Sequence, residues 1–118
     1  MKDAYSYLFN RDQKIRENVR ANERFKYNKN FKVISINNKS CNYQVFGVDI
    51  SISGMGFLSE VNFEKGDLVE IVFKCGNTNI PAVIEVVHAN LSDKGFFVGA
   101  RFVVIKDKYK EILNKQLI

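Results

Sequence analysis

Three polar residues and a glycine follow one another at the end of an apolar stretch, with a spacing that suits the binding of a small polar ligand. In the segment Tyr43–Ser53, the polar residues Asp49, Ser51 and Ser53 take alternate positions. The positions between them are apolar: Phe46, Val48, Ile50 and Ile52. Because successive side chains of a strand point to opposite faces, we expect one apolar face against a core and one polar ladder. Gly54 then permits a turn, beside which a carboxylate and two hydroxyls can hold a ligand.

A second group of polar residues lies nearer the N-terminus, where arginine recurs at every fourth position. Arg16, Arg20 and Arg24 would form one row on a helix, since residues four apart share a face. Ion pairs with Glu17 and Glu23 would explain such a row without any ligand. The residue type favours a ligand, because all three are arginine in a lysine-rich chain. The guanidinium fork grips phosphate, stacks on bases and reads the O6/N7 edge of guanine.

The charge of the chain is concentrated around these arginines. The 118 residues carry a net charge of +5, with 46% hydrophobic and 26% charged residues, as in one globular domain. Residues 1–32 contain nine Lys or Arg and four Asp or Glu, whereas the remainder is balanced. A local basic excess attracts anions such as a nucleotide, a nucleic acid or a membrane surface. A solvated basic tail is the alternative that needs no partner.

Several other classes of protein find no support in the sequence. No apolar run approaches the roughly 20 residues that span a bilayer, and no signal peptide is evident, so we expect a cytoplasmic protein without a membrane span. Cys41 and Cys75 lack the spacing of a metal site and are expected to be free thiols. His88 has no partners for general-base or metal chemistry. We therefore expect no enzyme, no metal and no cofactor.

The elements that must position the two polar groups are mostly short strands. Glycine, asparagine and aspartate turns separate six of them, at residues 25–37, 43–53, from 56, 67–74, 80–90 and 96–104. Helical periodicity marks residues 3–22 and 106–116. This pattern predicts an all-β fold with flanking helices: a six-stranded antiparallel β-barrel with an N-terminal helical arm, residues 1–19, and a barrel domain with a C-terminal helix, residues 20–118.

Two motifs within this pattern resemble the PilZ domain family of bacterial cyclic di-GMP (c-di-GMP) receptors. One is RxxxR before the first strand, here Arg20 to Arg24, and the other is [D/N]xSxxG, here Asp49 to Gly54. The strand order and the segment 99–102 are also similar to the family, and the resemblance covers about residues 20–104. It implies a c-di-GMP receptor that passes its signal to an unidentified downstream protein, in processes such as motility or biofilm formation.

The resemblance implies a role for each motif residue. Arg20 and Arg24 would hold phosphate or guanine, Asp49 would accept from guanine N1–H and N2–H, and Ser51 would donate to phosphate. Gly54 would leave room and permit a positive φ. Weaker candidates for the same site are Arg16, Ser53, Gly99 and Arg101.

Two other functions are compatible with such a chain. A PilZ-like adaptor would bind a protein and no nucleotide, but the motifs are intact. A small barrel that binds RNA or single-stranded DNA would need exposed aromatic residues on a basic sheet face. Since the basic excess lies in the arm, we expect no nucleic-acid polymer as partner. In the PilZ family, a basic residue just before RxxxR favours a stacked pair of ligands. Val19 holds this position and offers no guanidinium, so the resemblance implies one ligand per site, although Arg16 is one turn away.

Overall fold

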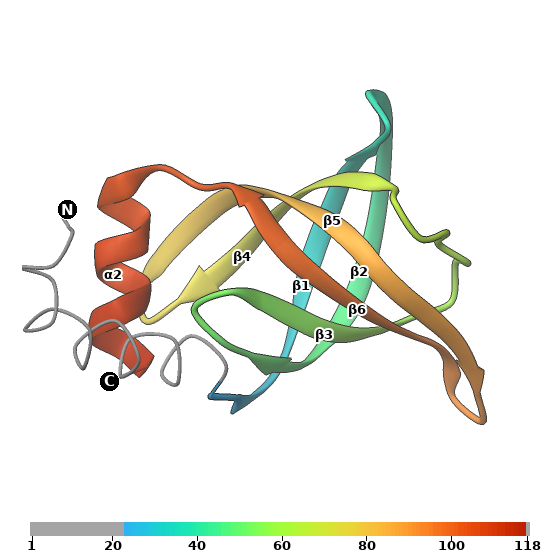
Figure 1. Cartoon of the computed structure of the whole chain (residues 1–118), viewed down its shortest axis with the longest axis horizontal. Helices are drawn as coiled ribbons and strands as arrows, with labels where there is room; N and C mark the ends of the chain where they lie inside the picture. The colour runs from blue at the N-terminus through green and yellow to red at the C-terminus, as the bar shows by residue number, and fades with distance from the viewer. Residues whose placement is uncertain (1–22, 118) are drawn as a thin grey trace, which may run out of the picture.

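Six antiparallel strands close into a barrel in this computed structural model, which describes residues 23–117 (Figure 1). The strands are β1 (Phe25–Ile36), β2 (Lys39–Ile50), β3 (Gly54–Ser59), β4 (Leu68–Cys75), β5 (Thr78–Ser92) and β6 (Gly95–Val104), followed by helix α2 (Asp107–Leu117). Around the barrel they follow the order β1-β2-β3-β6-β5-β4, and β4 pairs with β1. The predicted barrel and C-terminal helix are confirmed, whereas the predicted arm lies outside the described residues.

Tight hairpins make the strands longer than the sequence suggests. We expected a four-residue turn before β2, but Asn37 and Asn38 form the connection alone, with φ of 50° and 69°. Two consecutive left-handed residues are the signature of a type I′ hairpin, in which asparagine is favoured. Gly76, with φ of 61°, likewise shortens the β4–β5 connection, so that Cys75 pairs with Thr78.

The barrel interior is filled by apolar side chains from all six strands. Phe57 packs edge-to-face on Phe31 and Phe63, with ring centroids 5.3 and 5.8 Å apart. The predicted inward face of β6 is confirmed at Val98 and Ala100, which are buried. Helix α2 lies at one end of the barrel, where its predicted apolar stripe packs against the core: Tyr109, Ile112, Leu113 and Leu117 (Figure 1). No helix within residues 23–117 has the length and apolar character to cross a membrane.

The predicted alternation along β2 is wrong over its first half. Val45 is buried, whereas Phe46, expected in the core, is 40% exposed. The pattern then reverses, because Ile50 is buried as expected. The register between β2 and β3 shifts between Gly47 and Asp49, where β2 has one more residue than its partner. A β-bulge of this kind moves all later side chains to the opposite face, and nothing in simple apolar periodicity reveals it.

Candidate functional site

The bulge in β2 determines where Asp49 points. Without the extra residue Asp49 would follow Val45 and Gly47 into the barrel; with it, Ile50 is buried and Asp49 lies on the outer face, its side chain 32% exposed. Across the ladder, β1 has a matching irregularity, where Asn28 adopts a φ of 53°. Bulges commonly re-aim a side chain beside a functional site. The local irregularity therefore presents a carboxylate to solvent at the end of β2.

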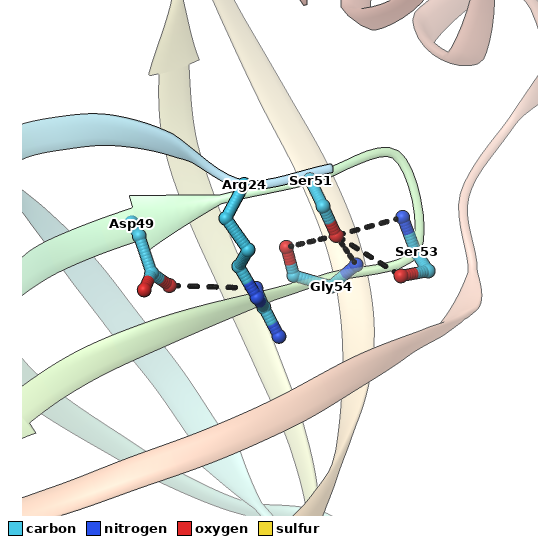
Figure 2. Close-up of polar contacts among 5 residues, drawn as sticks. All are labelled: Arg24, Asp49, Ser51, Ser53 and Gly54. Atoms are coloured by element: carbon cyan, nitrogen blue, oxygen red, sulfur yellow. Dashed lines mark hydrogen bonds and ion pairs between the residues drawn. The ribbon is translucent and has the colours of Figure 1, made fainter. Parts of the chain in front are cut away.

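Arg24 meets this carboxylate. Its Nη1 lies 3.4 Å from Asp49 Oδ1, and its side chain is 46% exposed (Figure 2). The antiparallel register explains the contact, because Phe25 pairs with Ile50 and the preceding residue therefore lies beside the end of β2. The two motifs, 25 residues apart in sequence, thus meet through one residue of each. Arg16 and Arg20 lie outside the described residues.

Ser51 lies in the turn that follows β2, not in a polar ladder on the strand. It is fully buried, and its Oγ accepts from the backbone N–H groups of Ser53 and Gly54, each at 3.2 Å (Figure 2). The same Oγ lies 3.0 Å from Ser53 Oγ. The predicted ladder fails here because β2 ends at Ile50, and the serine hydroxyl replaces backbone partners within the turn. A contact between this hydroxyl and a phosphate would require the turn to open.

Gly54 is required by a close approach of two strands. A Cβ at this position would overlap the carbonyl oxygen of Ala100 and lie 2.9 Å from Arg101 Cα, both in the backbone of β6. The expected positive φ is not observed, since Gly54 is absent from the left-handed residues of the described chain, whose glycines are Gly66, Gly76 and Gly95. The motif glycine therefore lets β3 pair closely with β6 directly after the turn.

Two of the weaker candidates, Ser53 and Arg101, fall beside the same turn, whereas Arg16 lies outside the described residues. Arg101 pairs with Gly54 across β3 and β6, and its guanidinium binds Glu85, with Nε 2.9 Å from Oε1. Arg101 and Ser53 also line a cleft of about 470 Å³ between the turn and α2. Gly99 lies further along β6, beneath the His88 ring.

Two basic residues near the site were not found from the sequence. Lys110 reaches the cleft from α2, and no motif or spacing links it to the turn. Lys26 pairs with Asp49 across β1 and β2, and only a known strand register could have indicated it. Both add positive charge near a site that already contains Arg24 and Arg101, which favours an anionic ligand.

Other reactive groups of the described chain lie apart from this turn. Cys41 and Cys75 are free thiols, as predicted. Burial raises the pKa of the Cys75 thiol, and the nearby positive charge of Lys29 opposes that rise. Residues 23–117 contain no group of three or more histidine, cysteine, aspartate or glutamate side chains suited to a metal ion.

Solved structures share this fold at low sequence identity. The Borreliella burgdorferi PlzA protein in complex with c-di-GMP has a TM-score of 0.62 and 15% identity, with 91% of this chain and 44% of that chain covered. Bacillus subtilis MotI/DgrA, an inhibitor of motility, gives 0.60 and 12%, covering 80% and 47%. The K. pneumonia MrkH–c-di-GMP complex gives 0.57 and 13%, covering 79% and 48%. The chain thus spans less than half the length of each.

Sequence comparison with families is more decisive than these structural matches. A comparison with curated proteins found no significant match. The model of the PilZ domain matches residues 18–118, which include Arg20, Arg24, the whole barrel and α2. Because this match extends over most of the sequence, the chain belongs to the PilZ domain family.

Proposed function

We propose that the chain is a c-di-GMP receptor that binds the dinucleotide between Arg20, Arg24 and the end of β2. The observation that carries the proposal is the contact of the Arg24 guanidinium with the Asp49 carboxylate at 3.4 Å, which joins the two motifs at one exposed point. PlzA and MrkH, which share the fold, are complexes with c-di-GMP and lend support. Arg20 is assigned to the ligand from the motif alone.

The Arg24–Asp49 ion pair would yield readily to such a ligand. Both side chains are substantially exposed, and exposed ion pairs contribute about 0–1 kcal/mol. A hydrogen bond between a charged group and a phosphate or base contributes about 1.5–3 kcal/mol. Exchange of the internal pair for two contacts with the ligand is therefore favourable. The pair keeps both groups near each other until the ligand separates them.

Asp49 gives the site its preference for guanine. An ionised carboxylate only accepts hydrogen bonds, and guanine offers two adjacent donors, N1–H and N2–H, on one edge. Adenine has no such pair, because its N6–H₂ donor stands next to the N1 acceptor, so c-di-AMP would offer the carboxylate one donor and one repelling lone pair. Arg24 would donate hydrogen bonds to a phosphate or to the O6/N7 edge of the base. The two residues together distinguish the base and the charge of the ligand.

Ser51 and Gly54 act in this proposal by shaping the turn. The buried Ser51 hydroxyl holds the N–H groups of Ser53 and Gly54, and Gly54 lets the turn pass close to β6. Their role is to fix the position of Asp49 beside Arg24. As a receptor without catalytic residues, the domain would signal through a downstream protein that responds to the bound state.

A protein adaptor that binds no nucleotide is the second candidate. It is favoured because the polar groups of the site already have partners within the protein: Arg24 and Asp49 pair with each other, and the Ser51 hydroxyl is hydrogen-bonded within the turn. Calorimetry at fixed salt separates the two functions. A receptor binds c-di-GMP, prefers it strongly to c-di-AMP and GTP, and takes up one ligand per chain. Absence of binding favours the adaptor, and equal binding of c-di-AMP contradicts the role of Asp49.

A further inference from the structure

The outer face of the barrel beside Asp49 carries two glycines that pair directly across β3 and β6. Gly56 lies opposite Gly99, and the same row continues to Asp49 on β2 and to His88 on β5. Neither glycine contributes a Cβ atom, so side chains from adjacent positions can lie against the backbone itself. We call this pair of glycines the glycine strip.

Two aromatic rings cover the glycine strip. Cε1 and Cδ2 of His88 are 2.6 and 3.1 Å from the point that a Cβ at Gly99 would occupy, so one face of the imidazole covers this glycine. Cζ of Phe97 lies 3.0 Å from the corresponding point above Gly56. The ring centroids are 6.1 Å apart, and the ring planes differ by 26°. The two rings are therefore near-parallel neighbours and form an aromatic layer over the glycine strip, in which His88 is exposed and Phe97 half-buried.

A hydrogen-bond acceptor borders this aromatic layer. Oδ1 of Asp49 lies 2.6 Å from the same point above Gly56 that Phe97 approaches. The carboxylate and the Phe97 ring thus flank one position on the sheet. On the side of the turn, the next charged pair is Arg101 with Glu85, while Arg24 lies beyond Asp49. A flat ring stacked on the layer would have its polar edge at Asp49 and cationic groups beside it.

We infer that Phe97 and His88 form a stacking platform for one guanine base of c-di-GMP, an inference that rests on the proposed function. The glycine strip is needed because any side chain there would lift the rings from the sheet. Stacking a base on an aromatic side chain contributes about 1–3 kcal/mol, which corresponds to roughly fivefold or more in affinity. The platform accepts any purine, whereas Asp49 selects guanine, so the two contributions are separable.

Substitutions that remove one ring and keep the fold test the platform by calorimetry with c-di-GMP. Phe97→Leu and His88→Ala should each weaken binding about fivefold or more and leave the ratio of c-di-GMP to c-di-AMP affinity unchanged. Tyr43→Leu is the matched control, because Tyr43 is an exposed aromatic residue on the distant half of β2, and it should bind as the wild type. If both ring variants bind c-di-GMP with wild-type affinity while Arg24→Ala loses binding, the platform is refuted and the proposed function stands. A wild type that binds no c-di-GMP would overturn the proposed function and the platform together.

Fluorescence provides a second measurement that does not depend on the loss of a side chain. The chain contains no tryptophan, so a single tryptophan introduced at position 97 or at position 43 reports only its own surroundings. The fluorescence of Phe97→Trp should change on addition of c-di-GMP, because the indole stacks on the base, and that of Tyr43→Trp should not. An unchanged Phe97→Trp signal under conditions in which calorimetry detects binding would contradict the stacking geometry.

Discussion

Replacement of Gly54 by alanine tests whether the motif glycine serves the fold or the ligand. The new Cβ would overlap the carbonyl oxygen of Ala100 and approach Arg101 Cα to 2.9 Å. Both are backbone atoms of β6, so relief requires the two paired strands to separate. Overpacking of this kind costs about 1–3 kcal/mol. Gly54→Ala should therefore lower the free energy of unfolding by about 2 kcal/mol, or the melting temperature by about 8 °C in a domain of this size.

Gly56→Ala is the matched variant. Its Cβ would approach Asp49 Oδ1 to 2.6 Å and Phe97 Cζ to 3.0 Å, which are the ends of side chains and can move away. We expect a smaller loss of stability than for Gly54→Ala, below about 1 kcal/mol, but weaker c-di-GMP binding because both displaced groups belong to the site.

Urea denaturation and calorimetry on the same two variants distinguish a structural role of Gly54 from a role in ligand binding. Gly54→Ala should lose more stability and Gly56→Ala should lose affinity while its unfolding midpoint stays near that of the wild type. Wild-type stability in Gly54→Ala, together with impaired binding, would show that the glycine serves the ligand directly and that the steric argument is wrong.

Three further predictions follow from the site and its surroundings. Arg24→Ala should weaken c-di-GMP binding about tenfold or more in calorimetry, and Arg16→Ala by less; the reverse order would move the functional RxxxR motif four residues toward the N-terminus. Ser51→Ala should lower the free energy of unfolding in urea by about 1–3 kcal/mol, because buried N–H groups of the turn lose their acceptor, and an unchanged midpoint would contradict this role. Burial raises the pKa of the Cys75 thiol in the folded state, so its stabilising contribution is complete below the ordinary thiol pKa of about 8.5 and is lost as the pH rises through the higher folded pKa. The decrease in the urea midpoint between about pH 7 and pH 10 should accordingly be smaller in Cys75→Ala, and an equal decrease would exclude this thiol as a cause.

The sequence predicts the architecture well, because turns and apolar faces follow local rules. Asparagine and glycine separate six apolar segments, and the observed strands differ from the predicted ones mainly where a turn needs only two residues, as at Asn37 and Asn38. The apolar stripe of α2 is likewise a local pattern, and Leu113 is fully buried as it predicts.

The geometry of the site depends on relations between strands, which periodicity does not contain. The bulge between Gly47 and Asp49 reverses the alternation along β2, so that Phe46 is exposed and Ile50 is buried, although a strictly alternating pattern assigns both to the core. Ser51 appears in sequence as the next residue of a polar ladder, yet the strand has ended and its hydroxyl is buried within the turn. The pairing of Gly56 with Gly99 depends on the register of β3 and β6, and neither glycine lies near the other in sequence.

The most direct test of the central claim is an NMR titration of the ¹⁵N-labelled chain with c-di-GMP. Arg24 and Asp49 lie at one end of the β1–β2 ladder, and the Asn37–Asn38 hairpin lies at the other (Figure 1). The largest shifts should occur at the backbone amides of Arg24, Asp49 and Gly56 and saturate at one ligand per chain, while the hairpin amides stay unchanged. An absence of shifts at Arg24 and Asp49, or larger shifts at the hairpin, would contradict a c-di-GMP site at the junction of the two motifs.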